Sequence, residues 1–154
     1  MIGKMLAFLA LSLVPAFAAA AAASERPAYA EGQVWEYRTR PQDSGSLVRI
    51  QKIETPGWAK KSGPIYHVTV IGVHFQGPAF VVGVIGHLPV SRQTLDASLI
   101  RLAPDQSTAF PGIEEGLDQW RRDKGGVFTL SLAEIVDMAE RTLSQSAPGQ
   151  ESRP

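Results

Sequence analysis

The hydrophobic pattern changes character twice along the 154 residues of the chain. An apolar stretch opens the sequence, an alternation typical of β-strands follows, and apolar residues at helical spacing fill the last third. In the alternating part, the pattern predicts strands over residues 33–38, 47–54, 65–75 and 80–85. Residues that favour turns, such as Pro, Gly, Asp and Ser, separate these strands. We therefore expect a four-stranded antiparallel meander.

The first two strands carry a pairing signal on both faces. Trp35 and Tyr37 share one face of the first strand, and Glu36 lies on the other. We predict a register in which Trp35 faces Ile50, which sets an aromatic side chain beside a β-branched one. The same register places Glu36 opposite Arg49, so that opposite charges meet on the second face.

Beyond residue 90 the spacing of apolar residues becomes helical. Ser91 is a suitable N-cap for a helix that runs to residue 102, because leucines recur there at i, i+4 and i+7. A second helix is predicted over residues 113–124, with acidic side chains early and basic ones late. A third follows Ser131, which forms a capping box with Glu134. Strands and helices are segregated, so we predict an α+β fold with about three helices packed on one face of the sheet.

The opening apolar stretch predicts a secretory signal peptide. Lys4 gives a positive n-region, and an uncharged apolar run follows it. Small residues at Ala18 and Ala23 fit cleavage between Ala18 and Ser24. The run approaches the roughly 20 residues that span a bilayer, so an uncleaved anchor is the alternative. Pro15 and the weakly hydrophobic alanines favour cleavage.

These segments divide the chain into four parts: a signal peptide at 1–23, a flexible lead at 24–32, a single α+β domain at 33–146 and a disordered tail at 147–154. The chain has no cysteine to carry a lipid anchor. We therefore expect a soluble protein, periplasmic or secreted, without stable membrane association after cleavage.

Composition narrows the classes of function. The 15 basic and 15 acidic side chains balance, which argues against nucleic acid as a partner. The lack of cysteine excludes thiol catalysis and cysteine-bound metals. The sequence also lacks the phosphate-loop, dinucleotide, zinc-protease and serine-hydrolase motifs. We predict no catalytic residue and no cofactor, and the chain is more typical of a binding protein than of an enzyme.

The histidines do not predict a metal site. His67 and His74 are separated by an odd number of residues, so they point to opposite faces of their strand. The favoured pairing of the third and fourth strands sets His87 opposite Val68, away from His67. A slip of one residue would bring His67 and His87 together. Metal binding is therefore not expected.

One aromatic residue lies in a polar loop. Trp58 follows Pro56 and Gly57 and precedes Lys60 and Lys61. Such a residue is a candidate anchor for a partner protein or a glycan. The alternative is a tryptophan folded back on the sheet.

Three short motifs resemble a family of small bacterial proteins that has no established activity: GQVWEYRTRP at 32–41, GHLPVS at 86–91 and GVFT at 126–129. The resemblance implies no catalytic residues. It implies that Arg40 and His87 occupy similar settings at strand ends. Were those ends neighbours, the two side chains would line one groove, with Arg40 as the donor to an anion. Structural roles for both residues are the alternative.

The leading hypothesis is a non-enzymatic binding module that recognises another protein or a small ligand. The candidate binding residues are Arg40, His87 and Trp58. An inhibitor or immunity protein acting on an enzyme of the same compartment is a second hypothesis. A hydrolase with an unfamiliar arrangement around His87 is a third.

Overall fold

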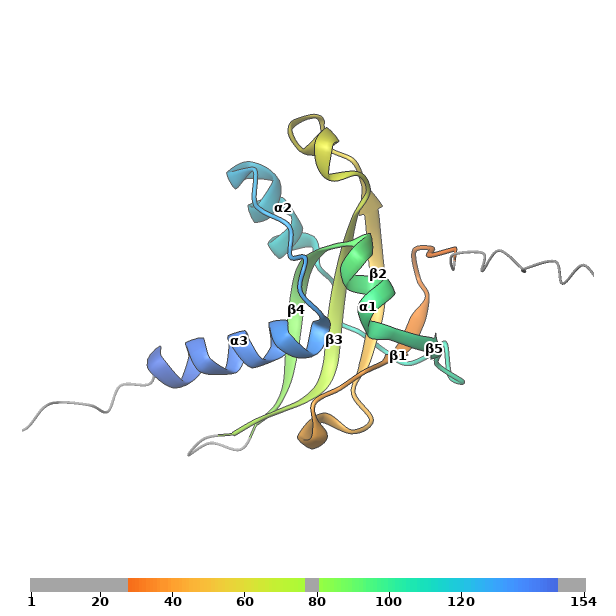
Figure 1. Ribbon diagram of the computed structural model, residues 1–154, viewed down its shortest axis with the longest axis vertical. Coiled ribbons are helices and arrows are strands. Elements are labelled where there is room, and N and C mark those ends of the chain that lie inside the picture. The colour runs from red at the N-terminus through yellow and green to blue at the C-terminus, as the bar shows by residue number, and fades with distance from the viewer. Residues whose placement is uncertain (1–27, 77–80, 147–154) are drawn as a thin grey trace, which may run out of the picture.

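The computed structural model describes residues 28–76 and 81–146 (Figure 1). The predicted signal peptide at 1–23 and the predicted tail at 147–154 lie outside the described residues. One antiparallel sheet has the strand order β4-β3-β2-β1-β5. Its strands are β1 (Val34–Tyr37), β2 (Leu47–Glu54), β3 (Ile65–Phe75), β4 (Val81–Ser91) and β5 (Leu99–Leu102).

The helices of the described residues are α1 (Arg92–Ser98), α2 (Glu114–Asp123), α3 (Leu132–Ser146) and the short 3-10 helices η1 (Pro41–Asp43) and η2 (Gly57–Ser62). The predicted α+β class is therefore confirmed. Both predicted N-terminal caps are present. Ser91 accepts a hydrogen bond from the amide of Thr94 at 3.2 Å. Glu134 accepts one from the amide of Ser131 at 2.9 Å, which closes the capping box.

The sheet has five strands instead of the predicted four, because the helix expected up to residue 102 ends at Ser98. Residues 99–102 become β5 and pair with the free edge of β1. Arg101 supports this pairing through an ion pair with Glu36, with Nε and Oε2 2.8 Å apart. The leucine spacing fits a helix equally well. Residues 99–102 form a strand because β1, which is distant in sequence, offers them an unpaired edge.

The larger hydrophobic core lies between the sheet and the helices α1 and α3, which cross the same face of the sheet (Figure 1). Leu95 of α1 and Leu132, Ile135 and Val136 of α3 are almost fully buried against it. Tyr66 and Val68 of β3 contribute from the sheet. Tyr29 joins the same core, with its ring centroid 5.6 Å from that of Trp35. Tyr29, which lies within the predicted lead, therefore packs against the folded domain.

Helix α2 packs on the opposite face of the sheet, so the prediction that all helices share one face is wrong. Side chains alternate along β3, and Tyr66 faces the larger core. Ile65 consequently points the other way, where it forms a second, smaller core with Ile113, Leu117 and Trp120. The first half of β3 is therefore covered on both sides, which explains its continuous run of buried residues.

Strand registers differ from the predicted ones. Trp35 pairs with Val48, two residues from its predicted partner Ile50. A shift of two residues keeps every side chain on its predicted face, but Glu36 pairs with Leu47 and not with Arg49. Alternation of apolar and polar residues therefore specified the faces without specifying the register.

An irregularity in β3 changes which residues face the core. Gly72 has a φ of 74°, and the pairing with β4 shifts between Ile71 and Val73. Such a bulge adds a residue to one strand and reverses the alternation beyond it. Val73 consequently joins Val68 and Val70 in the larger core. His74 then shares a face with His67, contrary to the prediction from their spacing.

Candidate functional site

Arg40 lies immediately before η1, and its side chain is 7% exposed. It binds Asp43 at 2.6 Å and Asp137 of α3 at 3.1 Å, and it also pairs with Glu140. Its guanidinium donates to the carbonyl of His74 at 3.3 Å. The hydrogen bond to Asp43 is the main reason why the pKa of Arg40 is raised. These contacts connect η1, the end of β3 and α3, which is a structural role.

Arg40 and His87 do not share a groove. Arg40 lies beside His74, whereas His87 lies beside His67. Residues 67 and 74 are about 23 Å apart along an extended strand. The two candidates suggested by the family resemblance therefore belong to different parts of the domain.

His67 and His87 stack on each other under α2. Their ring centroids are 5.1 Å apart with an interplanar angle of 10°, and His67 Nδ1 lies 2.9 Å from His87 Nε2. One ring must donate and the other accept. The prediction placed His87 opposite Val68. In the structure Val68 pairs with Leu88, so His87 turns to the face that carries His67.

Burial keeps the histidine pair uncharged near neutral pH. His67 is fully buried, and desolvation lowers its pKa to about 4. A charge on His87 would lower it further, and the nearby carboxylate of Glu54 opposes both effects. Burial also lowers the pKa of His87. Protonation of either ring would place a positive charge between the sheet and α2.

Glu54 and Arg121 form an ion pair at the edge of the histidine pair. Arg121 Nε donates to Glu54 Oε1 at 3.2 Å, and Arg121 Nη2 donates to Glu54 Oε2 at 2.5 Å. This pairing is the main cause of the lowered pKa of Glu54. Glu54 Oε1 is 3.5 Å from His67 Nε2. The carboxylate thus faces the buried ring while Arg121 neutralises its charge.

The donors of this cluster do not converge on one point. His67 directs Nδ1 toward His87 and Nε2 toward Glu54, so the two possible ligands lie on different sides of the ring. Within residues 28–76 and 81–146, no group of three His, Cys, Asp or Glu side chains is arranged to hold a metal ion.

Trp120 connects the histidines to the protein surface. Its ring centroid is 4.7 Å from that of His67 and 5.6 Å from that of Trp58. Its Nε1 donates to the carbonyl of Gly126 at 2.8 Å, which fixes the indole. Trp58, in η2, is 45% exposed. We call Trp58, Trp120, His67 and His87 the ring stack, because the four rings lead from solvent to the sheet.

Two glycines allow α2 and the segment after it to approach the ring stack closely. A Cβ atom on Gly116 would lie 2.7 Å from the Cβ of His87. A Cβ atom on Gly125 would lie 2.2 Å from Cδ1 of Trp120. Both distances are too short for a carbon contact, so larger residues at these positions would displace the rings.

Trp58 separates two surface hollows. The smaller, of about 360 Å³, lies on the side of Glu54, Pro56 and Arg121. The larger, of about 510 Å³, lies between η2, the start of α1 and residues 125–129. The exposed indole therefore borders both hollows, and its inner edge rests on Trp120. Neither hollow is lined by His67 or His87.

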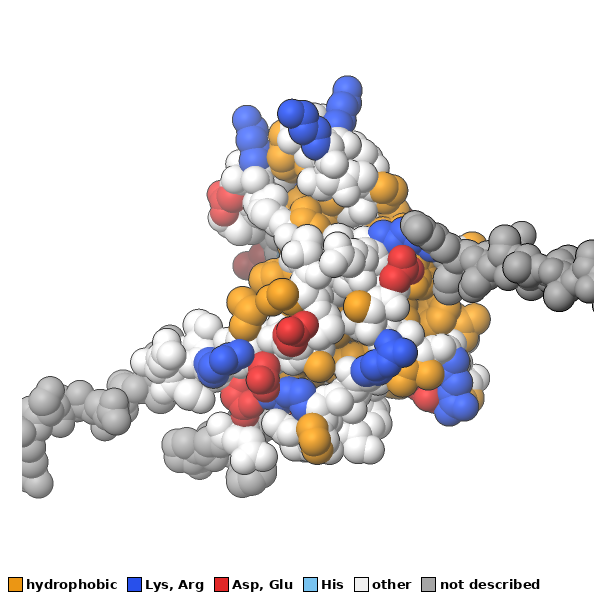
Figure 2. Space-filling model, viewed as in Figure 1, with side chains coloured by type: hydrophobic (Ala, Val, Ile, Leu, Met, Phe, Trp, Pro, Cys, Tyr) orange, Lys and Arg blue, Asp and Glu red, His pale blue; other side chains and the backbone are white. Residues whose placement is uncertain are grey.

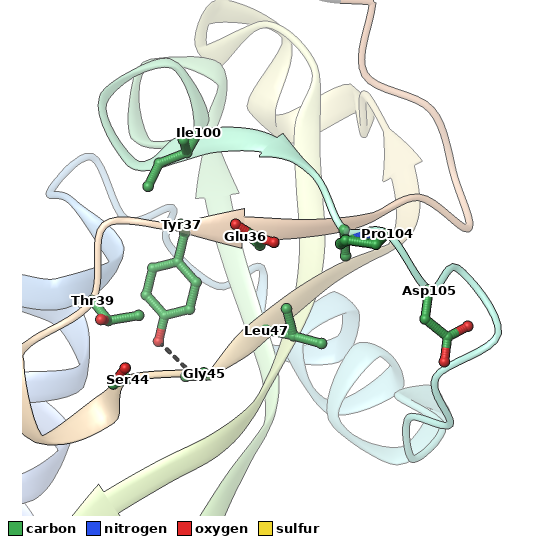
Figure 3. Close-up of a pocket in the computed structure, with 11 residues that line it drawn as sticks. Glu36, Tyr37, Thr39, Ser44, Gly45, Leu47, Ile100, Pro104 and Asp105 are labelled. Atoms are coloured by element: carbon green, nitrogen blue, oxygen red, sulfur yellow. Dashed lines mark hydrogen bonds between the residues drawn. The ribbon is translucent and has the colours of Figure 1, made fainter.

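A third hollow, of about 410 Å³, lies where β5 meets β1 and the turn before β2 (Figure 3). Tyr37 borders it, and its hydroxyl lies 2.8 Å from Ser46 Oγ. Ile100 is 57% exposed and, with Leu47, gives this hollow apolar walls. None of the candidate residues Arg40, His87 and Trp58 lines it.

The structure thus places two of the three predicted residues, His87 and Trp58, in one ring stack and leaves Arg40 outside it. Sequence reasoning missed His67 and Trp120 as the residues that join them. A glycine inside α2, at Gly116, was the available signal, because a glycine in a helix interior often marks a close contact.

Comparisons with family models, with curated proteins and with solved structures gave no match. Among the helices in the described part of the chain, none combines the length and the apolar character that crossing a bilayer requires.

Proposed function

We propose that this protein is a non-enzymatic binding module that acts after export, in the periplasm or outside the cell, and that Trp58 anchors its partner. One observation carries the proposal. Trp58 exposes 45% of its surface although its ring rests on Trp120 and borders two hollows. Tryptophan is one of the residue types enriched among the few side chains that dominate binding energy in interfaces.

The environment of the histidines supports a binding role over hydrolysis. A hydrolase would need a nucleophile beside a histidine base. His87 Nε2 is engaged by His67, and Thr69, on the same face of the sheet, donates its hydroxyl to the carbonyl of Gly86 at 2.8 Å. The lowered pKa of His67, to about 4, also leaves a weak base at neutral pH. An enzyme inhibitor or immunity protein is one form that such a binding module would take.

Photo-crosslinking in the producing cell tests this proposal. A photoreactive amino acid replaces Trp58 in one variant and Leu143 in another. Leu143 is 57% exposed on α3 and serves as the matched control. We expect a discrete adduct from position 58 and none from position 143. Equal adducts from both positions, or no adduct from position 58, would contradict the proposal.

A further inference from the structure

The charges of this protein are balanced in number but uneven in space. Lysine and arginine side chains project from the end of the molecule formed by η2 and α2 (Figure 2). Lys60 and Lys61 belong to η2, and Arg122 and Lys124 lie at the C-terminal end of α2. All four are exposed. This is the end of the molecule that carries Trp58.

None of these four cations has an acidic partner within residues 28–76 and 81–146, and Arg122 donates only to the side-chain amide oxygen of Gln119, at 2.7 Å. Lys60, Lys61 and Lys124 form no ion pair there. By contrast, Arg121 is neutralised by Glu54. Asp123, directly before Lys124, is exposed and accepts a hydrogen bond from Gln119, so it offsets part of the charge at the end of α2. The positive charge of η2, at Lys60 and Lys61, adjoins Trp58 in sequence and would attract an anionic partner.

The larger hollow beside Trp58 has a mixed lining and an open stretch of backbone. Trp58, Ala59 and Val127 give it apolar surface, and polar side chains that include Arg92 and Gln93 line the rest. Gly126 also lines it, and a Cβ atom there would have no neighbour within 4 Å. A cavity of about 510 Å³ accommodates a single large apolar side chain, and the glycine leaves room for the main chain that carries it.

We propose that the Trp58 end of the protein recognises an acidic segment of a partner protein, with one apolar side chain in the larger hollow and flanking carboxylates at Lys60, Lys61 and Lys124. This inference rests on the proposed binding function and names the chemistry of the partner. The apolar side chain would pack against the indole of Trp58 and provide most of the affinity. The carboxylates would orient the segment and raise the rate of association.

Labelled peptides provide the direct test. The probe is the pentapeptide Glu-Glu-Phe-Glu-Glu, and its matched controls carry Lys in place of Glu, or Gly in place of Phe. Fluorescence anisotropy measures binding to the full chain at two salt concentrations. We expect the acidic phenylalanine peptide to bind best and to weaken as salt rises, because exposed charges are screened.

Two variants separate the contributions of the indole and the lysines. Trp58→Ala should lower affinity about 30-fold, which corresponds to about 2 kcal/mol for a central interface tryptophan. Lys60→Gln with Lys61→Gln should lower it about 2- to 10-fold and reduce its salt dependence, as expected for exposed ion pairs. The control variant Ser144→Glu with Gln145→Glu changes the net charge equally on exposed positions of α3 and should leave binding unchanged.

Several outcomes would overturn the inference: equal binding of the basic peptide, no binding of the acidic peptide at about 1 mM, or an unaffected Trp58→Ala variant. Binding of oligogalacturonate without binding of the acidic peptide would instead identify an acidic glycan as the ligand. A position-58 adduct in cells, combined with failure of the acidic peptide, would retain the binding module and reject the acidic partner.

Discussion

At the scale of single residues, the buried histidine makes stability depend on pH. The pKa of His67 is about 4 in the folded protein, against 6.5 for an unperturbed histidine. The unfolded chain therefore takes up a proton first as pH falls. The stabilising contribution of neutral His67 is complete above pH 6.5 and is lost progressively between 6.5 and about 4.

We predict that the free energy of unfolding falls by at most about 1.4 kcal/mol per pH unit across this window through His67 alone. Urea unfolding at a series of pH values measures it, and His67→Phe should reduce the slope between pH 6.5 and about 4.5, leaving the part that comes from His87, whose pKa burial also lowers. His74→Gln removes a histidine whose side chain is 41% exposed and is the control. An unchanged slope in His67→Phe would contradict the prediction. Glu54 does not obscure the effect, because a carboxylate with a lowered pKa loses its contribution only at lower pH.

Arg40 illustrates a residue whose charge matters for structure. Arg40→Ala should cost about 3–5 kcal/mol, because it leaves the fully buried Asp43 without its cation. Arg141 also pairs with Asp137, at 3.8 Å, but is 67% exposed. Arg141→Ala should therefore cost less than about 1 kcal/mol. Chemical denaturation compares the two, and similar losses would show that burial of the ion pair is unimportant.

At the scale of elements, close contact fixes α2 to the sheet. Gly116→Val should destabilise the protein by about 1–3 kcal/mol, because its side chain would enter the space of His87. Gly126→Val adds the same atoms where a Cβ has no neighbour within 4 Å, and we expect a smaller loss. Thermal unfolding followed by tryptophan fluorescence measures both. A larger loss from Gly126→Val would contradict the packing described for α2.

The elements also show what the sequence could and could not predict. Strands β2 and β3 have the predicted boundaries because their alternation and flanking turns are local signals. Strand β5 is not predicted from the sequence. Whether residues 99–102 form a helix or a strand depends on pairing with the edge of β1, which is distant in sequence. The bulge at Gly72 reversed the faces beyond it, and glycine inside a strand was the only local indication.

The candidate site was less predictable than the fold. Trp58 and His87 were recognised as unusual residues. Their connection through Trp120 and His67 required α2 to occupy the second face of the sheet and β4 to shift by one residue. Periodicity determines neither of these choices. Both arrangements depend on β3 contributing apolar residues to a core on each face of the sheet, Tyr66 and Val68 on one and Ile65 on the other.

At the scale of the whole molecule, the two cores are unequal. The core beneath α1 and α3 contains most of the buried apolar residues, whereas that beneath α2 contains four: Ile65, Ile113, Leu117 and Trp120. We predict that amide hydrogens of α2 exchange through a local opening of lower free energy than those of β3 and the first turns of α3. Exchange of α2 only by global unfolding, measured residue by residue, would show that both cores form one cooperative unit.

The contacts of Arg40 have a consequence for the time course of folding. They join residues 97 and 100 positions apart in the chain, and β1 gains its second neighbour only when residues 99–102 are present. Long sequence separations of this kind slow folding, since a large loop must close before the contact forms. An incomplete chain therefore lacks both the outer strand and the helix that Arg40 secures. Slow folding of this kind would suit the export that we propose, because a chain that is still unfolded is the form that can be carried across a membrane.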